Sequence, residues 1–426
     1  MIRFMLAFCL AIGVSPLRAE RVRVVVAVGV PEVSALGVES LRANVIGSLS
    51  TATRIEKWGD SPAFAAEVDR AELDALRRDP RVQAVSLDTG GEGALHESVP
   101  LVRGDVVHAR GITGKGVTIA VLDTGIDVSN ADFAGRIVAQ RCFCDNLDGT
   151  GCCPNGMTQQ STGDAAVDDH GHGTHVSGIL AGSGAWSIRG VAPEVQIVAV
   201  KVMDKDNSFK SFTQIHRALD WIANERLDVK AINMSLGSFA LYGTSDCGTA
   251  ATAIGLRDVI AKLRQRGVVI TASSGNNGSI TQTTLPACMA DVMGVGAVYD
   301  TPGDHTAFCS APGAKADQVT CFTNSTDALD IVAPGAPISA TRRGGGSIVF
   351  SGTSMAAPHV AGAVALMQQV SRGSLSAWQA ESILKMTGVP VRDARNGLTF
   401  PRLDIAAAIA ATPHVDAQPR RRGVRK

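Results

Sequence analysis

The 426-residue sequence is poor in aromatic residues and carries no net charge, and both deficits exclude classes of function. Aromatic residues make up 4% of the chain, too few for a surface that stacks nucleic-acid bases. Lys and Arg number 40, as do Asp and Glu, so no overall field attracts nucleic acid or an anionic membrane. No apolar run reaches the roughly 18 residues that a membrane-spanning helix needs. We therefore expect neither a nucleic-acid partner nor a membrane span. We also expect a monomer.

The remaining composition is that of a folded α/β protein. Apolar residues make up 45% of the chain, charged residues 19%, and glycines number 45. These proportions are typical of a glycine-rich globular protein and exclude a disordered or fibrous chain. The length allows two or three domains, or one large domain with appendages.

The first 19 residues have the layout of an export signal. Arg3 supplies a positive charge, residues 4–14 are apolar, and a small residue, Ala19, follows as a cleavage point. Leu17 fits the small-x-small rule poorly, and a buried N-terminal strand is the alternative interpretation. We expect residues 1–19 to be a signal peptide and the protein to be secreted, to the periplasm if the source is Gram-negative.

Cysteine usage agrees with export. Of nine cysteines, Cys9 leaves with the signal, and the remaining even number predicts disulfides. Two candidate disulfides are Cys309 with Cys321 and Cys247 with Cys288, although the sequence alone does not fix the pairing. Four more cysteines lie close together in one loop: Cys142, Cys144, Cys152 and Cys153. A zinc site is the alternative to disulfides there, although the C-x-C and C-C spacings differ from the usual C-x2-C pairs of zinc ligands.

Residues 20–94 form a small cysteine-free module. The valine-rich residues 21–30 predict a strand, and residues 31–49 have apolar side chains at helical spacing. A strand, a short helix and another strand are then expected over 61–69, 71–79 and 80–88. The order predicts an α+β fold, and the glycine-rich stretch after residue 88 is typical of an exposed linker, where proteolysis concentrates.

Residues 95–411 change to long α/β alternation. Apolar runs predict strands over 116–123, 196–203, 229–237 and 268–275. Amphipathic helices are expected between them, over 211–225 and 255–267. Strands that are apolar on both faces and separated by helices predict a mainly parallel sheet covered on both sides. Residues 412–426 form a basic tail without periodicity, for which a solvated tail is favoured over a partner-binding patch.

Two polar residues stand in positions suited to catalysis. Asp123 ends the apolar run of residues 116–123, at the sheet edge where catalytic groups gather, although a turn residue is the ordinary role of such an aspartate. His172 lies between glycines in DDHGHGTHVSG, and an imidazole that titrates near pH 6.5 suits a general base. A metal site made with His170 and His175 is the alternative, but no acid follows in the zinc-protease pattern.

Ser354 opens a predicted helix in SGTSMAAPHVAG. The N-terminus of a helix presents N–H groups and partial positive charge, which stabilise the oxyanion formed in acyl transfer. An isolated serine at this place would more often serve as a helix cap only.

The motifs VLDTGID, HGHGTHVSG and GTSMAAPHVAG, in this order, resemble those of the subtilisin-like serine protease family. The order Asp, His, Ser separates that family from chymotrypsin-like enzymes and α/β-hydrolases. The resemblance covers about residues 95–411 and implies a three-layer α/β fold. It makes Asp123 the residue that orients the histidine, His172 the base and Ser354 the nucleophile. In TASSGNNG it makes Asn276 a donor to the oxyanion.

The resemblance also implies a substrate site and a regulatory module. Substrate would bind as an extended strand, against walls that comprise Ser235, Leu236, Gly237, Ala272, Ser273, Ser274 and Gly275. Thr284 is expected at the floor of the pocket, where it would limit very large side chains. Residues 20–94 resemble the family's ferredoxin-like inhibitory propeptide, which the enzyme would cut from its own chain during maturation.

No cofactor is expected for the chemistry, but a structural calcium ion is left open. Asp132 stands where many relatives place a calcium ligand, yet the loop after His172 (AGSGAWSIRG) lacks obvious oxygen ligands. The predicted activity is that of a serine endopeptidase. An inactive relative that only binds peptides is the alternative, and a non-peptidase serine hydrolase is disfavoured because no G-x-S-x-G elbow surrounds Ser354.

Overall fold

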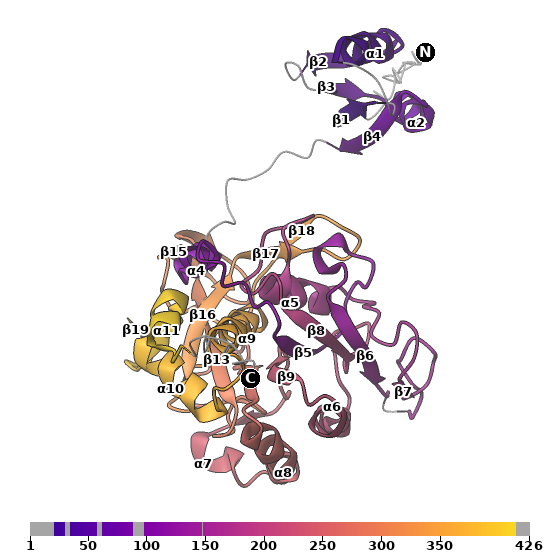
Figure 1. Ribbon diagram of the computed structural model, residues 1–426. Helices are drawn as coiled ribbons and strands as arrows, with labels where there is room; N and C mark the ends of the chain where they lie inside the picture. The colour runs from indigo at the N-terminus through magenta and orange to yellow at the C-terminus, as the bar shows by residue number, and fades with distance from the viewer. Residues whose placement is uncertain (1–20, 30–34, 58–61, 88–97, 147, 415–426) are drawn as a thin grey trace, which may run out of the picture. The chain divides into compact units, whose positions relative to one another are not determined.

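The computed structural model describes residues 21–29, 35–57, 62–87, 98–146 and 148–414, in two compact units, Met1–Gly93 and Ala94–Lys426. The predicted signal peptide and the tail beyond residue 414 lie outside the described residues. Each unit is described by itself (Figure 1).

The N-terminal unit is a four-stranded sheet with two helices. Its elements follow the order βαββαβ: β1 (Val22–Val28), α1 (Ala35–Gly47), β2 (Thr53–Lys57), β3 (Ala63–Val68), α2 (Arg70–Arg78) and β4 (Val82–Leu87). The strand order β2-β3-β1-β4, with antiparallel neighbours, is that of a ferredoxin-like fold. Its core comprises Val24, Val26, Phe64, Val68 and Leu76.

One strand of this unit was not predicted. All five residues of β2 are exposed, so the segment TRIEK shows no alternation of buried and exposed side chains. It joins the sheet through backbone pairing with β3, which sequence patterns of hydrophobicity do not register.

The C-terminal unit is built on a ten-stranded sheet with the order β19-β20-β16-β13-β11-β9-β5-β8-β6-β7. From β6 to β20 neighbouring strands run parallel, and β7 and β19 pair antiparallel at the edges. The strands are β5 (Thr118–Asp123), β6 (Ile137–Phe143), β7 (Gln159–Gln160), β8 (Gln196–Lys201), β9 (Val229–Met234), β11 (Val269–Ser273), β13 (Met293–Tyr299), β16 (Ile331–Ala336), β19 (Val389–Arg392) and β20 (Thr399–Arg402).

Helices cover both faces of this sheet, because its strands are apolar on both sides. Along β5, Ile119 and Val121 belong to the core around α9 (Thr353–Val370), whereas Ala120 and Leu122 belong to the core around α6 (Phe212–Glu225). The helix α5 (His172–Ala181) lies on the α9 face, and α8 (Ala251–Gln265) lies on the α6 face. The predicted three-layer fold is confirmed (Figure 1).

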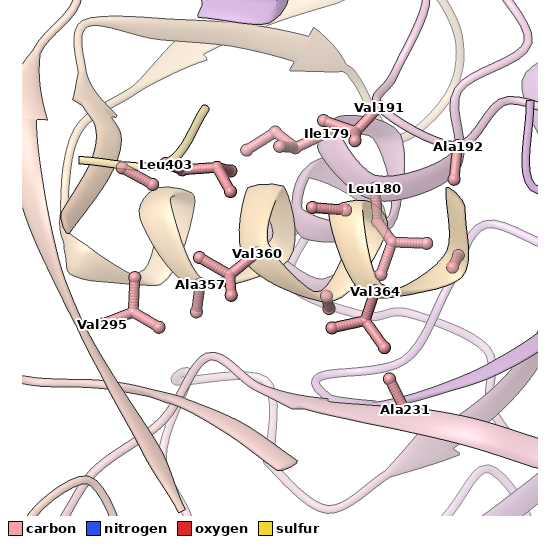
Figure 2. Packing of buried hydrophobic residues seen from close by; sticks show 14 of the residues in the cluster. Ile179, Leu180, Val191, Ala192, Ala231, Val295, Ala357, Val360, Val364 and Leu403 are labelled. Carbon is pink, nitrogen blue, oxygen red and sulfur yellow. The ribbon is translucent and has the colours of Figure 1, made fainter. Parts of the chain in front are cut away.

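The helix α9 is the centre of the larger core. It packs across β9, β11, β13 and β16 and against α5. Small and β-branched residues such as Ala357, Val360 and Val364 let it approach the sheet, with Ile179 and Leu180 of α5 beside it (Figure 2).

Shorter elements complete the unit. The helices are α3 (Ser98–Leu101), α4 (Gly104–His108), η1 (Ala131–Phe133), α7 (Thr244–Cys247), α10 (Ala377–Thr387) and α11 (Ile405–Ala411). Three two-stranded sheets pair β10 (Leu241–Tyr242) with β12 (Thr283–Thr284), β14 (Gly303–His305) with β15 (Ala311–Ala314), and β17 (Ile338–Thr341) with β18 (Ser347–Phe350).

The eight cysteines of this unit form four disulfides. Cys309 pairs with Cys321 and Cys247 with Cys288, so both predicted pairings are confirmed. In the cysteine-rich loop the alternative zinc site is wrong, because the four thiols are used in two nested bridges, Cys142–Cys153 and Cys144–Cys152. These bridges brace the loop that follows β6.

Candidate active site

Asp123 is the last residue of β5, a central strand whose six residues are all buried. Its carboxylate has no exposed surface, and its Oδ1 accepts the backbone N–H of Thr124 at 2.7 Å. The same oxygen accepts a hydrogen bond from Nδ1 of His172, also at 2.7 Å. The aspartate and the histidine that the sequence singled out are therefore direct partners.

His172 is the first residue of α5, and the glycine that follows it allows the close approach to Asp123. A Cβ on residue 173 would lie 2.1 Å from the carbonyl oxygen of Gly125 and 3.0 Å from Asp123 Oδ1. Any side chain there would push the helix start away from the strand end. The glycine that follows the histidine in the motif is thus required for the packing of the helix start against the strand end.

The contact with Asp123 fixes the tautomer of His172. A carboxylate only accepts hydrogen bonds, so Nδ1 carries the proton and Nε2 is left with a lone pair. Burial lowers the pKa of His172, but the charge of Asp123, its hydrogen bond and the charge of Asp168 outweigh that effect, so the pKa is raised above its usual value. The ring is thus a stronger base than a free imidazole.

Ser354 is the second residue of α9, and its helix start lies beside that of α5. His175, one turn along α5, packs its ring 4.6 Å from that of Phe350, four residues before Ser354. The Ser354 hydroxyl donates to the carbonyl oxygen of Ser235 at 3.3 Å. Among the described residues this is its only hydrogen bond, so Ser354 Oγ is not bonded to His172 in this rotamer. Bonds of this kind often tighten only when substrate binds.

Asn276 follows β11 and is oriented by the residue before Ser354. Its Oδ1 accepts both the backbone N–H and the hydroxyl of Thr353, each at 2.9 Å. The amide oxygen is therefore fully engaged, and Nδ2 is left as the donor that faces the start of α9. A Cβ on Gly352 would lie 3.2 Å from that nitrogen.

A cavity of about 250 Å³ adjoins these residues and is lined by both Ser354 and Asn276. Its walls include predicted substrate-binding residues from the ends of β9 and β11: Ser235, Leu236, Gly237, Ser273 and Gly275. Ala272 and Ser274 are not lining residues. Both are fully buried, with Ala272 in the core on the α6 face.

Thr284 lies between the two walls of this cavity. A Cβ on Gly237 would lie 2.5 Å from Thr284 Oγ1, and one on Gly275 would lie 2.7 Å from its Cγ2. The Thr284 hydroxyl donates to the Ser273 carbonyl at 3.1 Å, which holds the side chain in this place. The glycines therefore make room for the threonine, which lines the cavity between them.

Other lining residues were not predicted from sequence: Met203, Asn207, Ser208, Phe209, Ser238, Phe239, Asn277 and Thr353. Met203 follows β8 at the same sheet edge as Asp123. Because binding residues gather at the carboxyl ends of strands in open α/β sheets, its position after a predicted strand could have revealed it. Phe209, Ser238 and Phe239 also line an adjoining cavity of about 920 Å³, together with Phe212, Tyr242 and Leu256. The surface beside Ser354 is thus wider than one side-chain pocket.

Comparison with known proteins agrees with this geometry. The sequence matches the profile of the subtilase family over residues 114–403. The chain belongs to the subtilase family. It is 33% identical to subtilisin E of Bacillus subtilis over 316 residues, which cover 72% of this chain and 70% of that protein.

Two further relatives support the assignment. The subtilase is 34% identical to an alkaline protease of Shouchella clausii over 313 residues, 72% of this chain and 69% of that protein. A crystal structure of a cold adapted subtilisin-like serine proteinase is similar with a TM-score of 0.52 at 29% identity, and the match covers 68% of this chain and 89% of that one. The subtilase is thus a subtilisin-like serine endopeptidase.

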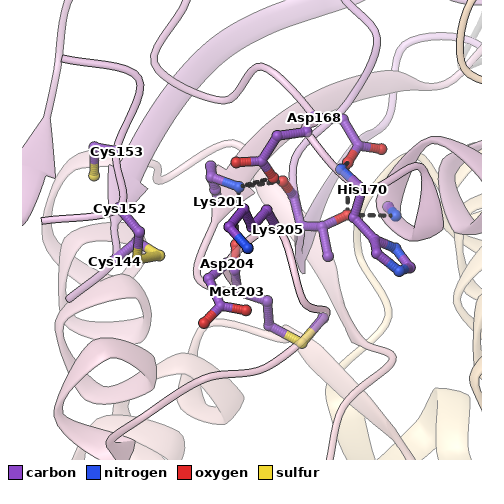
Figure 3. A network of polar contacts seen from close by, with 12 residues as sticks. Cys144, Cys152, Cys153, Asp168, His170, Lys201, Met203, Asp204 and Lys205 are labelled. Atoms are coloured by element: carbon purple, nitrogen blue, oxygen red, sulfur yellow. Dashed lines mark hydrogen bonds and ion pairs between the residues drawn. A yellow bond between two sulfur atoms is a disulfide. The ribbon is translucent and has the colours of Figure 1, made fainter. Parts of the chain in front are cut away.

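Lys201 is the last residue of β8 and is buried behind the site. It is the register partner of Asp123 on the neighbouring strand β5. Its ammonium donates to the carbonyl oxygens of Thr124 and Met203, at 2.8 and 2.9 Å, and to Asp169 Oδ1 at 2.6 Å (Figure 3). The lysine is therefore fully used in joining backbone segments around the site. It is not available to act on substrate.

Asp132, the candidate calcium ligand, is surrounded by protein donors. Its Oδ1 accepts the backbone N–H groups of Ala185 and Trp186, and its Oδ2 accepts the hydroxyls of Ser187 and Thr341. The loop after α5 thus satisfies this carboxylate with hydrogen bonds, and the lone pairs that a calcium ion would need are engaged.

The described residues offer neither a metal-binding cluster nor a membrane-spanning helix. They contain no group of three or more His, Cys, Asp or Glu side chains arranged to hold a metal. None of their helices combines the length and the apolar character that crossing a membrane requires.

Proposed function

We propose that the subtilase is a secreted serine endopeptidase that cleaves peptide bonds through an acyl-enzyme on Ser354. The observation that carries the proposal is the 2.7 Å hydrogen bond between His172 and Asp123, which lie on elements that contact α9, the helix whose second residue is Ser354. In this role Nε2 of His172 takes the Ser354 proton as the hydroxyl attacks the substrate carbonyl. The same nitrogen then returns the proton to the leaving amine.

Charge on the substrate oxygen would be stabilised by two donors. Nδ2 of Asn276 is free to donate, because Thr353 holds the other end of that amide. The backbone N–H of Ser354, in the first turn of α9, would be the second. Water then attacks the ester with His172 again as the base, which releases the acid and restores the serine.

Protein and peptide substrates would bind as an extended strand along residues 235–237. The support is that these residues and Ser273 line the cavity next to Ser354. The Thr284 floor favours small and medium-sized side chains in that cavity. The subtilase would act as a monomer and without a cofactor.

We propose further that the chain is made as a zymogen. Residues 1–19 would direct export, residues 20–94 would fold as an inhibitory propeptide, and Ser354 would cut near residues 88–95. The ferredoxin-like fold of the N-terminal unit supports the second of these roles. Four disulfides in the C-terminal unit fit an oxidising compartment.

The experiment compares the wild-type precursor with the Ser354→Ala variant, both expressed with the full N-terminal sequence. Casein hydrolysis and N-terminal sequencing of the secreted product are measured. We expect the wild type to digest casein and to begin near residue 95, and the variant to do neither. A wild type that binds but never cleaves peptides would show an inactive subtilase, and normal processing of the variant would show that another protease makes the cut.

A further inference from the structure

Asp168 is the first residue of DDHGHGTHVSG and has been given no catalytic role so far, yet its buried carboxylate accepts five hydrogen bonds. Its Oδ1 accepts the hydroxyl of Thr124 at 2.8 Å and the backbone N–H groups of His170 and Gly171 at 3.0 and 2.8 Å. Its Oδ2 accepts the backbone N–H of Thr174 at 2.9 Å and that residue's hydroxyl at 2.6 Å. The side chain is 2% exposed, so solvent competes little for these bonds.

These donors belong to the two segments that carry the catalytic pair. Thr124 follows Asp123 directly, whereas Gly171 and Thr174 flank His172 at the start of α5. The Thr124 hydroxyl also accepts the backbone N–H of Gly173 at 2.9 Å. Thus, besides the bond between Asp123 and His172, the Thr124 hydroxyl links the strand end to the helix start both directly, through Gly173, and by way of Asp168.

We propose that Asp168 is a positioning residue of the catalytic machinery, whose carboxylate fixes the strand end that carries Asp123 to the helix start that carries His172. The proposal rests on the proposed function, since it takes His172 as the general base. Helix capping alone would not require the contact with Thr124, because a cap engages only N–H groups of its own helix. The link to a second element is what distinguishes positioning from capping.

Asp168 is ionised in this role. Burial acts to raise the pKa of Asp168, but hydrogen bonds from Thr174, Gly171 and Thr124 outweigh it, so the pKa lies below its usual value. The carboxylate is thus a second negative charge near His172, in addition to Asp123. Its attraction contributes to the raised pKa of His172, against the opposing effect of burial.

The other charged and titratable groups around His172 are few. His170 lies on the same approach segment with its ring centroid 6.4 Å away, and His175 follows on α5. From the β17–β18 turn, Arg343 donates to the backbone carbonyl of Asp168 at 2.8 Å. On the β8 side, the ammonium of Lys201 is paired with Asp169. Removing the Asp168 charge therefore leaves Asp123 as the carboxylate that raises the basicity of His172.

The test is a pH profile of kcat and kcat/KM on a chromogenic peptide for Asp168→Asn. We expect kcat to fall about 10- to 100-fold with KM nearly unchanged, because a small misplacement of the base slows chemistry without weakening binding. The acid limb of kcat/KM should move to lower pH, since the second negative charge is gone.

Asp132→Asn is the matched control. Asp132 is also buried, and its carboxylate also accepts five hydrogen bonds, but its partners belong to the loop after α5 and to β17. We expect this variant to lose thermal stability while kcat and the acid limb stay as in the wild type. If Asp168→Asn behaves like Asp132→Asn, Asp168 is structural only and the inference is overturned.

A second pair of variants decides the matter if Asp168→Asn does not fold. Thr124→Val removes the hydroxyl link and keeps the charge, so kcat should fall about tenfold while the acid limb stays. Thr124→Ser should recover most of that loss. Equal kcat in the valine and serine variants would contradict the inference. Hydrolysis by Ser354→Ala would instead overturn the proposed function itself, whatever the Asp168 variants do.

Discussion

His172 Nδ1 lies 2.7 Å from Asp123 Oδ1, although 49 residues separate them in the sequence. The contact joins the end of a central strand to the start of a helix on the face of the sheet that α9 covers. It determines which nitrogen of the imidazole carries the proton and leaves Nε2 to act as a base. The proposed catalysis by Ser354 requires this bond, because it orients the base.

The activity should fall on the acid side of neutral pH. Because the pKa of His172 is raised above 6.5, protonation of Nε2 removes the base already above that pH. We expect the acid limb of kcat/KM to have its midpoint above pH 6.5, measured on a peptide substrate between pH 5 and 10. A midpoint well below 6.5 would show that His172 is not the titrating group.

Asp123→Asn should lower kcat on the order of 10⁴-fold, measured on the same peptide substrate.

Asn276→Ala should slow the chemical step. The variant removes the Nδ2 donor, and the loss of one such donor typically costs about 10²- to 10³-fold in kcat. KM should change little, since the bond forms mainly with the charged intermediate. Steady-state kinetics on one peptide separate the two constants. A rise in KM with kcat unchanged would make Asn276 a substrate-binding residue instead.

Thr284→Gly should deepen the substrate cavity. The side chain stands between the walls at Gly237 and Gly275, so its removal makes room for larger residues before the cleaved bond. We expect relative kcat/KM for Phe and Tyr at that position to rise about tenfold in a peptide-library profile. Thr283→Gly is the control, because Thr283 precedes it in β12 and is not a lining residue. Equal profiles for both variants would place the floor elsewhere.

Two buried histidines should make the fold sensitive to acid. Burial lowers the pKa of His175 to about 3 and that of His359 to about 4. The unfolded chain binds these protons near pH 6.5, so it is the unfolded state that gains protons as the pH falls. Stability should drop by about 1.4 kcal/mol per pH unit for each histidine as the pH falls from 6.5 toward the folded-state pKa values of about 3 for His175 and about 4 for His359.

Urea unfolding of the Ser354→Ala protein between pH 6.5 and 5 measures this slope without autolysis. His359→Asn in the same background provides the comparison, because it removes one of the two proton uptakes and leaves all other groups in place. Its slope should be shallower by about 1.4 kcal/mol per pH unit. Identical slopes would show that His359 is protonated or accessible in the folded state.

The sequence predicted the parts of the site that form contiguous motifs. Asp123, His172 and Ser354 each lie in a glycine-rich or apolar segment whose local pattern is visible without a structure. Four strands of the central sheet, β5, β8, β9 and β11, were predicted from their buried apolar runs. The strands β6, β13 and β16 were not predicted. β2 was missed because its side chains are all exposed.

What the sequence did not reveal depends on contacts between distant segments. Phe209 and Phe239 line the cavity through the folding of loops that carry no catalytic group. Ala272 was expected at the cavity wall, but alternation along β11 turns it toward the core on the α6 face. The five donors of Asp168 come from residues whose convergence no linear spacing indicates.

The most direct test of the account is to locate the nucleophile. The mature protein is labelled with a fluorophosphonate, digested with trypsin, and the modified peptide is sequenced by mass spectrometry, with Ser354→Ala treated in parallel. We predict one adduct, on Ser354, and neither label nor casein hydrolysis in the variant, whose activity should fall on the order of 10⁶-fold. An adduct on another residue, or a variant that still takes the label and digests casein, would contradict the account.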